Sequence, residues 1–281
     1  MTSDMDIRGT ASSDAGNRAI GLAGVLGRQQ PALGAFSVAG FPDERAGVDV
    51  LVAYARSGAN LLEVGAPAAD PWLDGPAIAA AHRRARRAKH GMEVTLATVR
   101  QVSAITGKPV VVMSYWATVL AYGPQRTTHD LAASGAAGCL IPDVPPEDVP
   151  AWATAAARAG ISAPLLAGRE ASAAELTATC RAATGFVYAP AVAGQRTGYS
   201  DGLDLEALSS FVASIRHAAP TTPVMTGIGV STPALAASVV RRPGVAGVVI
   251  GSPLIRAFID GGLSKAAGLV AEFAASIAAP R

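Results

Sequence analysis

The chain has 281 residues, of which 50% are hydrophobic and 16% are charged, a composition that excludes a disordered protein. A formal net charge of +2 and an aromatic content of 5% argue against a protein that binds nucleic acid or a membrane surface. The two cysteines are too few for a disulfide framework, and no apolar run reaches the ~20 residues of a membrane span. We therefore expect a cytoplasmic globular protein.

The N-terminal segment is polar over residues 1–18, and an apolar run follows over residues 19–27. Two aspartates stand near the start, where a signal peptide would carry basic residues. We expect residues 1–30 to form an extension, partly disordered, whose apolar run makes a short helix that covers one end of the domain. That domain is expected to span residues 31–281.

Short apolar runs alternate with helical stretches from residue 31 onward. The runs are nearly continuous, as is typical of parallel strands buried on both faces. The predicted strands span 33–39, 60–64, 109–114, 138–141, 162–167, 185–189, 223–227 and 246–250. The predicted helices span 43–57, 76–105, 125–135, 146–159, 171–182, 203–217, 232–241 and 253–277. This alternation predicts an α/β fold, a (β/α)8 TIM barrel in a single domain, with an open doubly wound sheet as the alternative.

Two of the predicted helices carry a clear start signal. Thr232 stands before Pro233, and Ser252 stands before Pro253. A hydroxyl side chain is favoured at the N-cap, and proline is favoured in the first helical turn. We therefore expect both hydroxyl residues to cap these helices.

Carboxylates gather around the end of the second predicted strand. Period-2 alternation puts Glu63 on the same face as Leu61, and a carboxylate in a buried strand is costly unless it is solvated or used. The loop that follows holds Asp70 and Asp74, and in a barrel such loops carry the chemistry. Two carboxylates over one apolar pocket can divide the roles of acid and base. The structural alternative has both aspartates as caps and Glu63 paired with an arginine.

Glycines follow the seventh and eighth predicted strands. Gly227 and Gly229 come after the seventh, and Gly251 and Ser252 come after the eighth. Exposed backbone N–H groups and a helix N-terminus can hold a phosphate, and many barrels bind one at these two strand ends. We expect a phosphorylated small molecule, because no nucleotide-binding motif is present, although simple tight turns are the alternative. The Gly/Thr-rich loop at 190–200 is predicted to be a mobile lid or an ordinary surface loop.

Residues 63–76 carry a resemblance to a known family. They read E-V-G-A-P-A-A-D-P-W-L-D-G-P, which resembles the motif E-[LV]-G-x-P-[FY]-S-D-P-x-x-D-G-P of the tryptophan synthase α subunit. Six further segments fit that family in order: 36–43, 113–115, 142–147, 185–188, 227–231 and 251–252. The resemblance implies a lyase of tryptophan biosynthesis, which cleaves indole-3-glycerol phosphate to indole and glyceraldehyde 3-phosphate.

The resemblance also implies a role for each site residue. Glu63 would be the proton shuttle of a retro-aldol cleavage, and Asp74 would accept a hydrogen bond from the indole N–H. Thr197 would position Asp74 when the lid closes. The other substrate-binding residues form two groups: Phe36, Tyr115 and Tyr188 around the indole, and Gly198, Gly227, Gly229, Gly251 and Ser252 around the phosphate.

The sequence departs from the family at three places. Ala68 and Ala69 stand where the family usually has an aromatic residue and a serine. Trp116-Ala117-Thr118 follows Tyr115 where many members read Tyr-Asn-Pro, and Gln195-Arg196 lengthens the loop after the sixth strand by one residue. In the family these loops lie near the lid and the β-subunit contact. The family implies a heterotetramer with a β subunit. A free-standing indole-producing lyase of a secondary pathway and a non-catalytic subunit that activates a β-like partner are the alternatives.

We expect neither a metal nor a cofactor. The four histidines fall on predicted helices without the spacing of metal ligands. The basic run over residues 83–89 is expected to be a solvated outer face of a helix, and Cys139 is expected to be a small buried hydrophobic residue.

Overall fold

The computed structural model describes residues 21–28, 30–87, 91–192, 194, 197–198 and 202–279. Most of the predicted N-terminal extension lies outside this range, so the boundary at residue 30 stays a prediction. No helix in the described part of the chain is long and apolar enough to cross a membrane.

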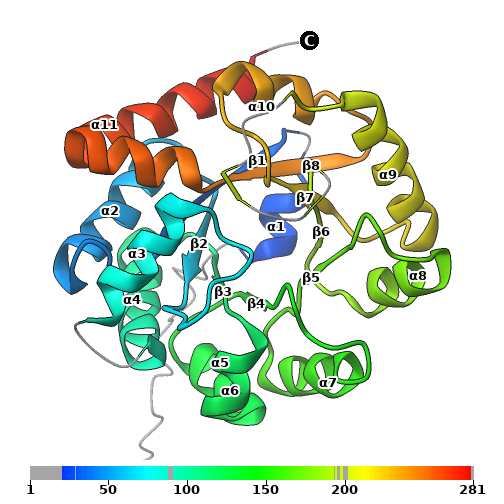
Figure 1. The fold of residues 1–281 in the computed structure, drawn as a ribbon, viewed down its shortest axis with the longest axis horizontal. Helices are drawn as coiled ribbons and strands as arrows, with labels where there is room; N and C mark the ends of the chain where they lie inside the picture. The colour runs from blue at the N-terminus through cyan, green and yellow to red at the C-terminus, as the bar shows by residue number, and fades with distance from the viewer. Residues whose placement is uncertain are drawn as a thin grey trace, which may run out of the picture.

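Eight parallel strands form the centre of the molecule, and helices surround them (Figure 1). The strands are β1 (Ala32–Val38), β2 (Leu61–Gly65), β3 (Val110–Met113), β4 (Gly138–Leu140), β5 (Leu165–Leu166), β6 (Val187–Ala189), β7 (Val224–Thr226) and β8 (Val245–Ile250). The last residue of each strand lies within two residues of the last residue of the corresponding predicted strand.

The strands follow one another in chain order around a ring. Their order in the sheet is β4-β3-β2-β1-β8-β7-β6-β5, with all pairs parallel. Isolated parallel bridges from Gly138 to Ser162 and from Ile141 to Leu165 join the two ends of this order. The predicted barrel is therefore confirmed, and the open doubly wound sheet is wrong because the order never reverses.

The helices differ from the prediction in two places. They are α1 (Leu22–Leu26), α2 (Glu44–Arg56), α3 (Pro76–Arg86), α4 (Gly91–Thr106), α5 (Trp116–Tyr122), α6 (Pro124–Ala133), α7 (Val149–Ala159), α8 (Ala173–Ala182), α9 (Leu205–Ala218), α10 (Pro233–Val240) and α11 (Ser252–Ala278). The single helix predicted over 76–105 is two helices, α3 and α4. The short helix α5 was not predicted, because its N-cap residue makes no side-chain hydrogen bond that would mark a start.

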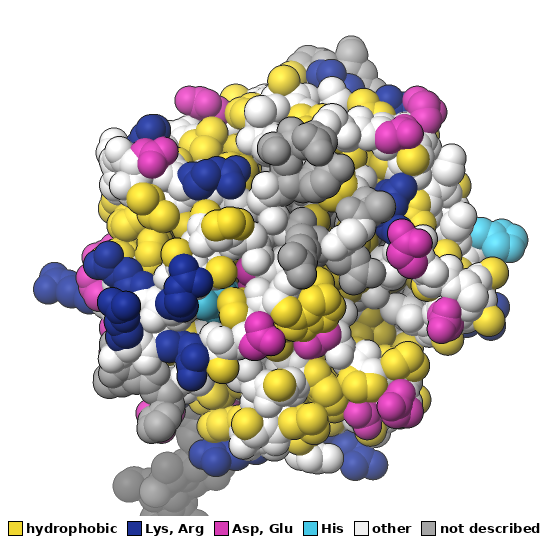
Figure 2. Space-filling view, viewed as in Figure 1, with side chains coloured by type: hydrophobic (Ala, Val, Ile, Leu, Met, Phe, Trp, Pro, Cys, Tyr) yellow, Lys and Arg dark blue, Asp and Glu magenta, His cyan; other side chains and the backbone are white. Residues whose placement is uncertain are grey.

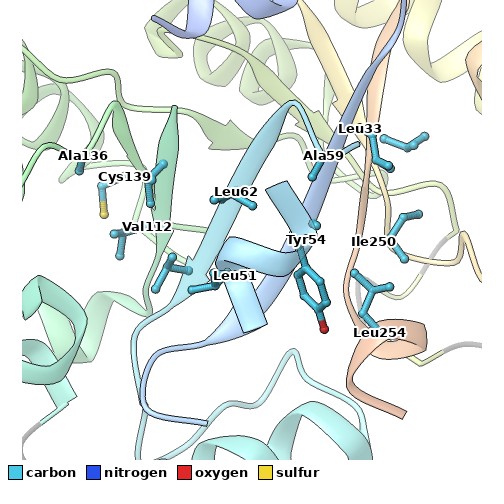
Figure 3. Close-up of a cluster of buried hydrophobic side chains, with 14 of the residues drawn as sticks. Leu33, Leu51, Tyr54, Ala59, Leu62, Val112, Ala136, Cys139, Ile250 and Leu254 are labelled. Carbon is cyan, nitrogen blue, oxygen red and sulfur yellow. The ribbon is translucent and has the colours of Figure 1, made fainter. Parts of the chain in front are cut away.

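Two clusters of buried side chains follow from the alternation along the strands. Leu62 and Val64 of β2 belong to the outer cluster, between the strands and the helices. Figure 3 shows Leu62 in this cluster with Leu51 and Tyr54 of α2. Leu61 belongs to the inner cluster, which fills the barrel. Successive side chains of a strand point to opposite faces, so Glu63 points to the same face as Leu61. Its side chain therefore lies inside the barrel, as predicted.

The helix α1 covers the end of the barrel where the strands begin. Leu22, Val25 and Leu26 are buried and belong to the inner cluster. A methyl group at Gly138 or Gly185 would lie only 3.4 or 3.2 Å from Leu22 Cδ1. Glycine at these two positions thus leaves space for the Leu22 side chain, and α1 lies within the apolar run where the sequence predicts a short helix.

The described part of the basic run, residues 83–87, and Cys139 lie as predicted. Arg83, Arg84 and Arg86 on α3 and Arg87 at its C-cap are exposed, and Figure 2 shows basic side chains gathered on that side of the molecule. Cys139 is fully buried in the outer cluster. Neither takes part in the cavity described next.

Candidate active site

A cavity opens at the end of the barrel where the strands finish and the connecting loops begin. Its empty space, part of which is open to solvent, is about 730 Å³. Apolar side chains such as Ile78, Met113 and Leu140 form much of the wall. Of the predicted site residues, those that line the cavity are Phe36, Glu63, Asp74, Tyr188, Thr197, Gly198, Gly227, Gly229, Gly251 and Ser252.

Glu63 is a buried carboxyl group without a counter-charge. Its side chain is 6% exposed, and its Oε2 has no hydrogen-bond partner. Burial, followed by the charge of the nearby Asp74, raises the pKa of this carboxyl group from 4.5 to about 8. No arginine in the described part of the chain forms an ion pair with Glu63. A carboxyl group with this pKa can exchange a proton near neutral pH.

Asp74 is the second carboxylate of the cavity, and donors from different elements hold it. Tyr115 donates its hydroxyl to Asp74 Oδ2 at 2.7 Å, and Thr197 Oγ1 lies 3.4 Å from Oδ1. The N-cap of α3 is Gly75, and no side chain caps this helix. Asp74 is therefore not a helix cap, and its carboxylate is directed to the cavity wall instead.

Tyr115 does not lie where it was expected. It is absent from the residues that line the cavity and instead lines a second hollow beside Ala68 and Tyr122. Burial, followed by the charge of Asp74, raises the pKa of Tyr115, so this phenol stays protonated and acts as a donor. Its ring therefore supports Asp74 from behind and does not form part of the pocket wall.

Thr197 joins the loop after β6 to the loop after β2. Its backbone N–H donates to Leu73 O at 2.9 Å, and its Oγ1 accepts from the backbone N–H of Gly75 at 2.7 Å. A methyl group at Gly75 would overlap the carbonyl of Thr197, so this close approach requires glycine. The rest of the predicted lid, including Gln195-Arg196, lies largely outside the described residues.

The glycines after β7 and β8 form one end of the cavity. Gly227 has no room for a side chain, because a methyl group there would overlap the hydroxyl of Tyr188. That hydroxyl accepts a hydrogen bond from Ile228 N at 3.1 Å and so fixes the backbone after β7. Gly229 has a φ of 98°, a conformation that favours glycine.

The helix that follows β8 begins one residue earlier than predicted. Its N-cap is Gly251, so Ser252 is the first helical residue and makes no capping bond. The prediction of Ser252 as a cap is therefore wrong, whereas Thr232 accepts from Leu235 N as expected of a cap. Arg256, one turn into α11, is the one Lys or Arg among the described residues of the cavity wall. The uncapped helix start and this arginine together favour an anion.

The comparisons with known proteins agree with one another. A family model described as tryptophan synthase alpha chain matches residues 22–276. The tryptophan synthase alpha chain of Streptomyces coelicolor is 36% identical over 264 residues, which cover 91% of this chain and 94% of the relative. That of Leifsonia xyli is 35% identical over 248 residues, 88% of this chain and 93% of the relative. This chain belongs to the tryptophan synthase alpha chain family.

Solved structures of this family share the fold. A chain of tryptophan synthase from Mycobacterium tuberculosis has a TM-score of 0.83 at 33% identity, covering 92% of this chain and 97% of that chain. Tryptophan synthase subunit alpha from Legionella pneumophila has a TM-score of 0.80 at 26% identity, covering 91% of this chain and 96% of that chain. The barrel described above is thus the barrel of the tryptophan synthase alpha chain family.

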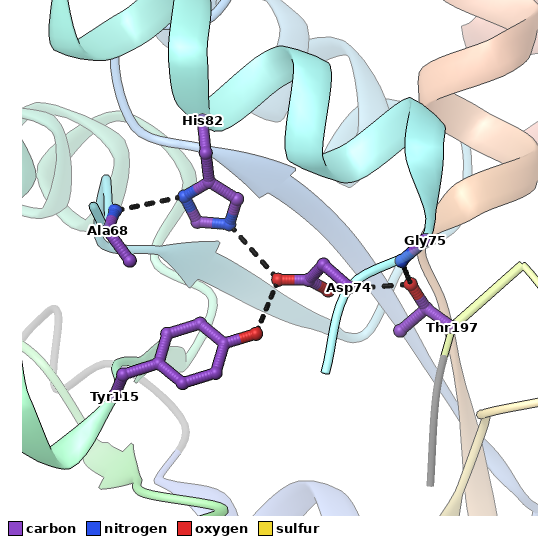
Figure 4. A network of polar contacts seen from close by, with 6 residues as sticks. All are labelled: Ala68, Asp74, Gly75, His82, Tyr115 and Thr197. Atoms are coloured by element: carbon purple, nitrogen blue, oxygen red, sulfur yellow. Dashed lines mark hydrogen bonds and ion pairs between the residues drawn. The ribbon is translucent and has the colours of Figure 1, made fainter. Parts of the chain in front are cut away.

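One departure from the family motif takes part in the site. The backbone N–H of Ala68 donates to Nδ1 of His82 at 3.1 Å, and Nε2 of His82 lies 3.2 Å from Asp74 Oδ2 (Figure 4). His82 is fully buried on α3. The sequence indicates only that His82 lies on a helix without metal-ligand spacing, because both partners of this side chain come from the tertiary structure. In the described part of the chain, no group of three or more His, Cys, Asp and Glu could hold a metal ion.

A second departure lies outside the cavity. Asp143 holds two loops together: its Oδ1 accepts from Trp116 N at 2.7 Å, and its Oδ2 accepts from Trp72 Nε1 at 3.2 Å. Trp72 is 46% exposed, and Leu120 on α5 is 54% exposed. Most other large hydrophobic side chains in the described part of the chain are buried, with Ile105, Ile259 and Leu263 as the further exceptions.

Proposed function

We propose that Glu63 and Asp74 catalyse the reaction of this family in the cavity, the cleavage of indole-3-glycerol phosphate to indole and glyceraldehyde 3-phosphate. The chain is a lyase of the tryptophan synthase alpha family, and the proposal concerns the role of each residue. One observation carries it. A buried carboxyl group with a raised pKa and a second carboxylate held by a donor line the same apolar cavity.

The raised pKa of Glu63 fits the first step. Glu63 starts protonated and gives its proton to C3 of the indole, which leaves a positive charge on the ring nitrogen. Asp74 accepts the hydrogen bond from the indole N–H and stabilises this charge. The Glu63 carboxylate then takes the proton of the glycerol hydroxyl next to C3. The carbon–carbon bond breaks, its electron pair restores the indole ring, and the aldehyde forms, so Glu63 ends protonated as it began.

The substrate is held at two ends. Phe36 and Tyr188 line the apolar part of the cavity, where a flat indole ring can lie. The phosphate binds at the start of α11, where Ser252 can donate from its backbone N–H and its hydroxyl. Arg256 adds the positive charge that a phosphate dianion attracts.

We also propose that the chain works with a β subunit in the cytoplasm. The similar chain from Mycobacterium tuberculosis belongs to a structure of tryptophan synthase. The exposed Trp72 and Leu120 offer apolar surface near the loops that border the cavity. Through Asp143, a partner that binds there would act on the loop after β2, which carries Asp74.

The test is an assay of indole formation from indole-3-glycerol phosphate by the purified chain, alone and with a tryptophan synthase β subunit. We expect turnover in both conditions, with a higher rate when the partner is present. No turnover by a folded chain in either condition would overturn the lyase assignment of this site. Turnover that the β subunit leaves unchanged would support the free-standing alternative.

A further inference from the structure

We propose that His82 is a positioning residue, which holds Oδ2 of Asp74 so that Oδ1 is left to bind the substrate. This inference rests on the proposed role of Asp74 as the acceptor for the indole N–H. It concerns a side chain that no motif singled out and that lies behind the cavity wall, on helix α3.

The hydrogen bond from the loop after β2 fixes the tautomer of His82. A backbone N–H can only donate, so Nδ1, which lies 3.1 Å from Ala68 N, must be the unprotonated nitrogen of the ring. A neutral imidazole then carries its proton on Nε2.

The Nε2 atom of His82 lies next to the carboxylate of Asp74. Nε2 lies 3.2 Å from Oδ2 and has no well-aligned hydrogen-bond partner in the described part of the chain. The charged group that it faces is the Asp74 carboxylate, whose side chain is 3% exposed. Contacts of this kind tighten when substrate binds. The ring of Tyr115 lies edge-on to that of His82, with centroids 6.5 Å apart, and adds no second charge.

The two oxygens of Asp74 are therefore not equivalent. Oδ2 accepts from Tyr115 at 2.7 Å and lies next to His82 Nε2, whereas among the described residues Oδ1 has only the long 3.4 Å contact with Thr197 (Figure 4). The hydrogen bond from Tyr115 and the nearby Nε2 of His82 both favour one orientation of the carboxylate about its Cβ–Cγ bond. Oδ1 keeps lone pairs for a ligand, and Asp74 lines the cavity.

The sequence explains how one side chain can reach both partners. Asp74 immediately precedes the start of α3, and His82 lies about two turns later on the same helix. Ala68 lies in the middle of the loop that Asp74 ends. His82 thus ties the middle of this loop and its catalytic end to one rigid helix.

Two substitutions separate the two contacts of His82. In His82→Asn, the amide oxygen can take the position of Nδ1 and accept from Ala68, but the side chain is too short to reach Asp74. In His82→Gln, the longer amide can place its NH2 near Oδ2 of Asp74. We expect His82→Asn to lower kcat at least tenfold with KM changed less than twofold, because the charge on the indole develops only in the transition state. We expect His82→Gln to keep kcat within about threefold of the wild type.

Several outcomes would overturn the proposal. The proposal is wrong if His82→Asn keeps the wild-type kcat, or if kcat of a folded His82→Gln falls as far as that of His82→Asn. His82 would then be a buried residue that only stabilises the fold through its hydrogen bond. A purely structural role would lower the melting temperature of both variants and leave kcat per folded molecule unchanged. A wild-type chain without any turnover would instead contradict the proposed function and not this inference.

The wild-type protein offers a test that does not depend on the folding of a variant. Nitrogen NMR of the labelled chain should show the neutral tautomer of His82 with its proton on Nε2. A neutral tautomer with its proton on Nδ1 would contradict the arrangement on which the proposal depends.

Discussion

Glu63 shows how burial prepares a single residue for its chemistry. The same carboxyl group would be ionised at neutral pH on the surface, but in the barrel its pKa is raised to about 8. The folded chain therefore binds more protons than the unfolded chain between about pH 4.5 and pH 8, and this group makes folding less favourable as the pH rises through that window. Replacing it with a neutral isostere should remove the effect.

We accordingly expect Glu63→Gln to gain stability relative to the wild type as the pH rises. The difference in the free energy of unfolding should increase by about 3 kcal/mol from pH 5 to pH 8. Urea unfolding of both proteins at several pH values measures it. A matched control is Glu147→Gln, which changes a carboxyl group outside the cavity wall and should show no such trend. A constant difference for Glu63→Gln would show that its carboxyl group titrates normally.

The site residues differ in how far they follow from the sequence. Glu63 could be predicted because a charged residue interrupts an apolar strand, and Asp74 because it lies in the loop that follows. Tyr115 was expected in the pocket wall, yet its hydroxyl binds Asp74 from behind. The contact between His82 and Asp74 depends on the course of the loop after β2, which no local pattern specifies. Local chemistry thus indicates which residues act, and tertiary structure decides which residues support them.

At the scale of elements, the contact between the loops after β2 and β6 depends on Gly75. We expect Gly75→Ala to lower kcat at least tenfold, because the added methyl group overlaps the Thr197 carbonyl and shifts the neighbouring Asp74. Steady-state kinetics and a melting curve test this expectation. Gly202→Ala is a matched control, since nothing lies within 4 Å of the added methyl group. Wild-type kcat in Gly75→Ala would mean that the two loops need not touch.

A second prediction at the scale of elements concerns Arg256, near the start of α11. We expect Arg256→Gln to raise KM for the phosphorylated substrate about three- to tenfold, with kcat nearly unchanged, because the arginine attracts the phosphate in the ground state and the transition state alike. The effect should shrink at high salt. Arg100→Gln, an exposed arginine of α4 away from the cavity wall, is the control. If KM stays the same at low salt, the arginine does not contact the phosphate.

Most of the elements could be predicted, and the exceptions have physical causes. Buried parallel strands are short apolar runs, so all eight were visible in the sequence. The helix α5 was missed because it begins at Trp116 without a capping side chain and ends after two turns at Gly123, whose φ is 97°. The start of α11 was placed one residue late because Gly251, not the hydroxyl of Ser252, is the N-cap.

At the scale of the whole molecule, the two ends of the barrel have different roles. The helix α1 closes the end where the strands begin, and the loops at the other end form the cavity. The order of the strands follows the chain around the ring, so residues far apart in sequence, such as Asp74 and Thr197, meet across the same opening. The fold thereby determines where catalysis takes place, while the loops determine which reaction occurs.

The exposed apolar side chains near this opening lead to an expectation for the complex. We expect Trp72→Ala to raise the β-subunit concentration needed for half-maximal activation at least tenfold, because an apolar contact is lost. The rate of the isolated chain should fall less than threefold. Titration of the β subunit in the indole assay measures both values. Ile259→Ala removes an exposed apolar side chain of α11 and serves as the control. An unchanged titration curve for Trp72→Ala would exclude this tryptophan from the contact.

The most direct test of the account is the rate of indole formation by Glu63→Gln and Asp74→Asn, each measured beside the wild type with the β subunit present. Both variants keep the shape of the side chain and remove its ability to exchange a proton or carry a charge. We expect each to lower kcat by about 100-fold or more while the chain stays folded. Wild-type kcat in both folded variants would contradict the assignment of these two carboxyl groups as the catalytic pair.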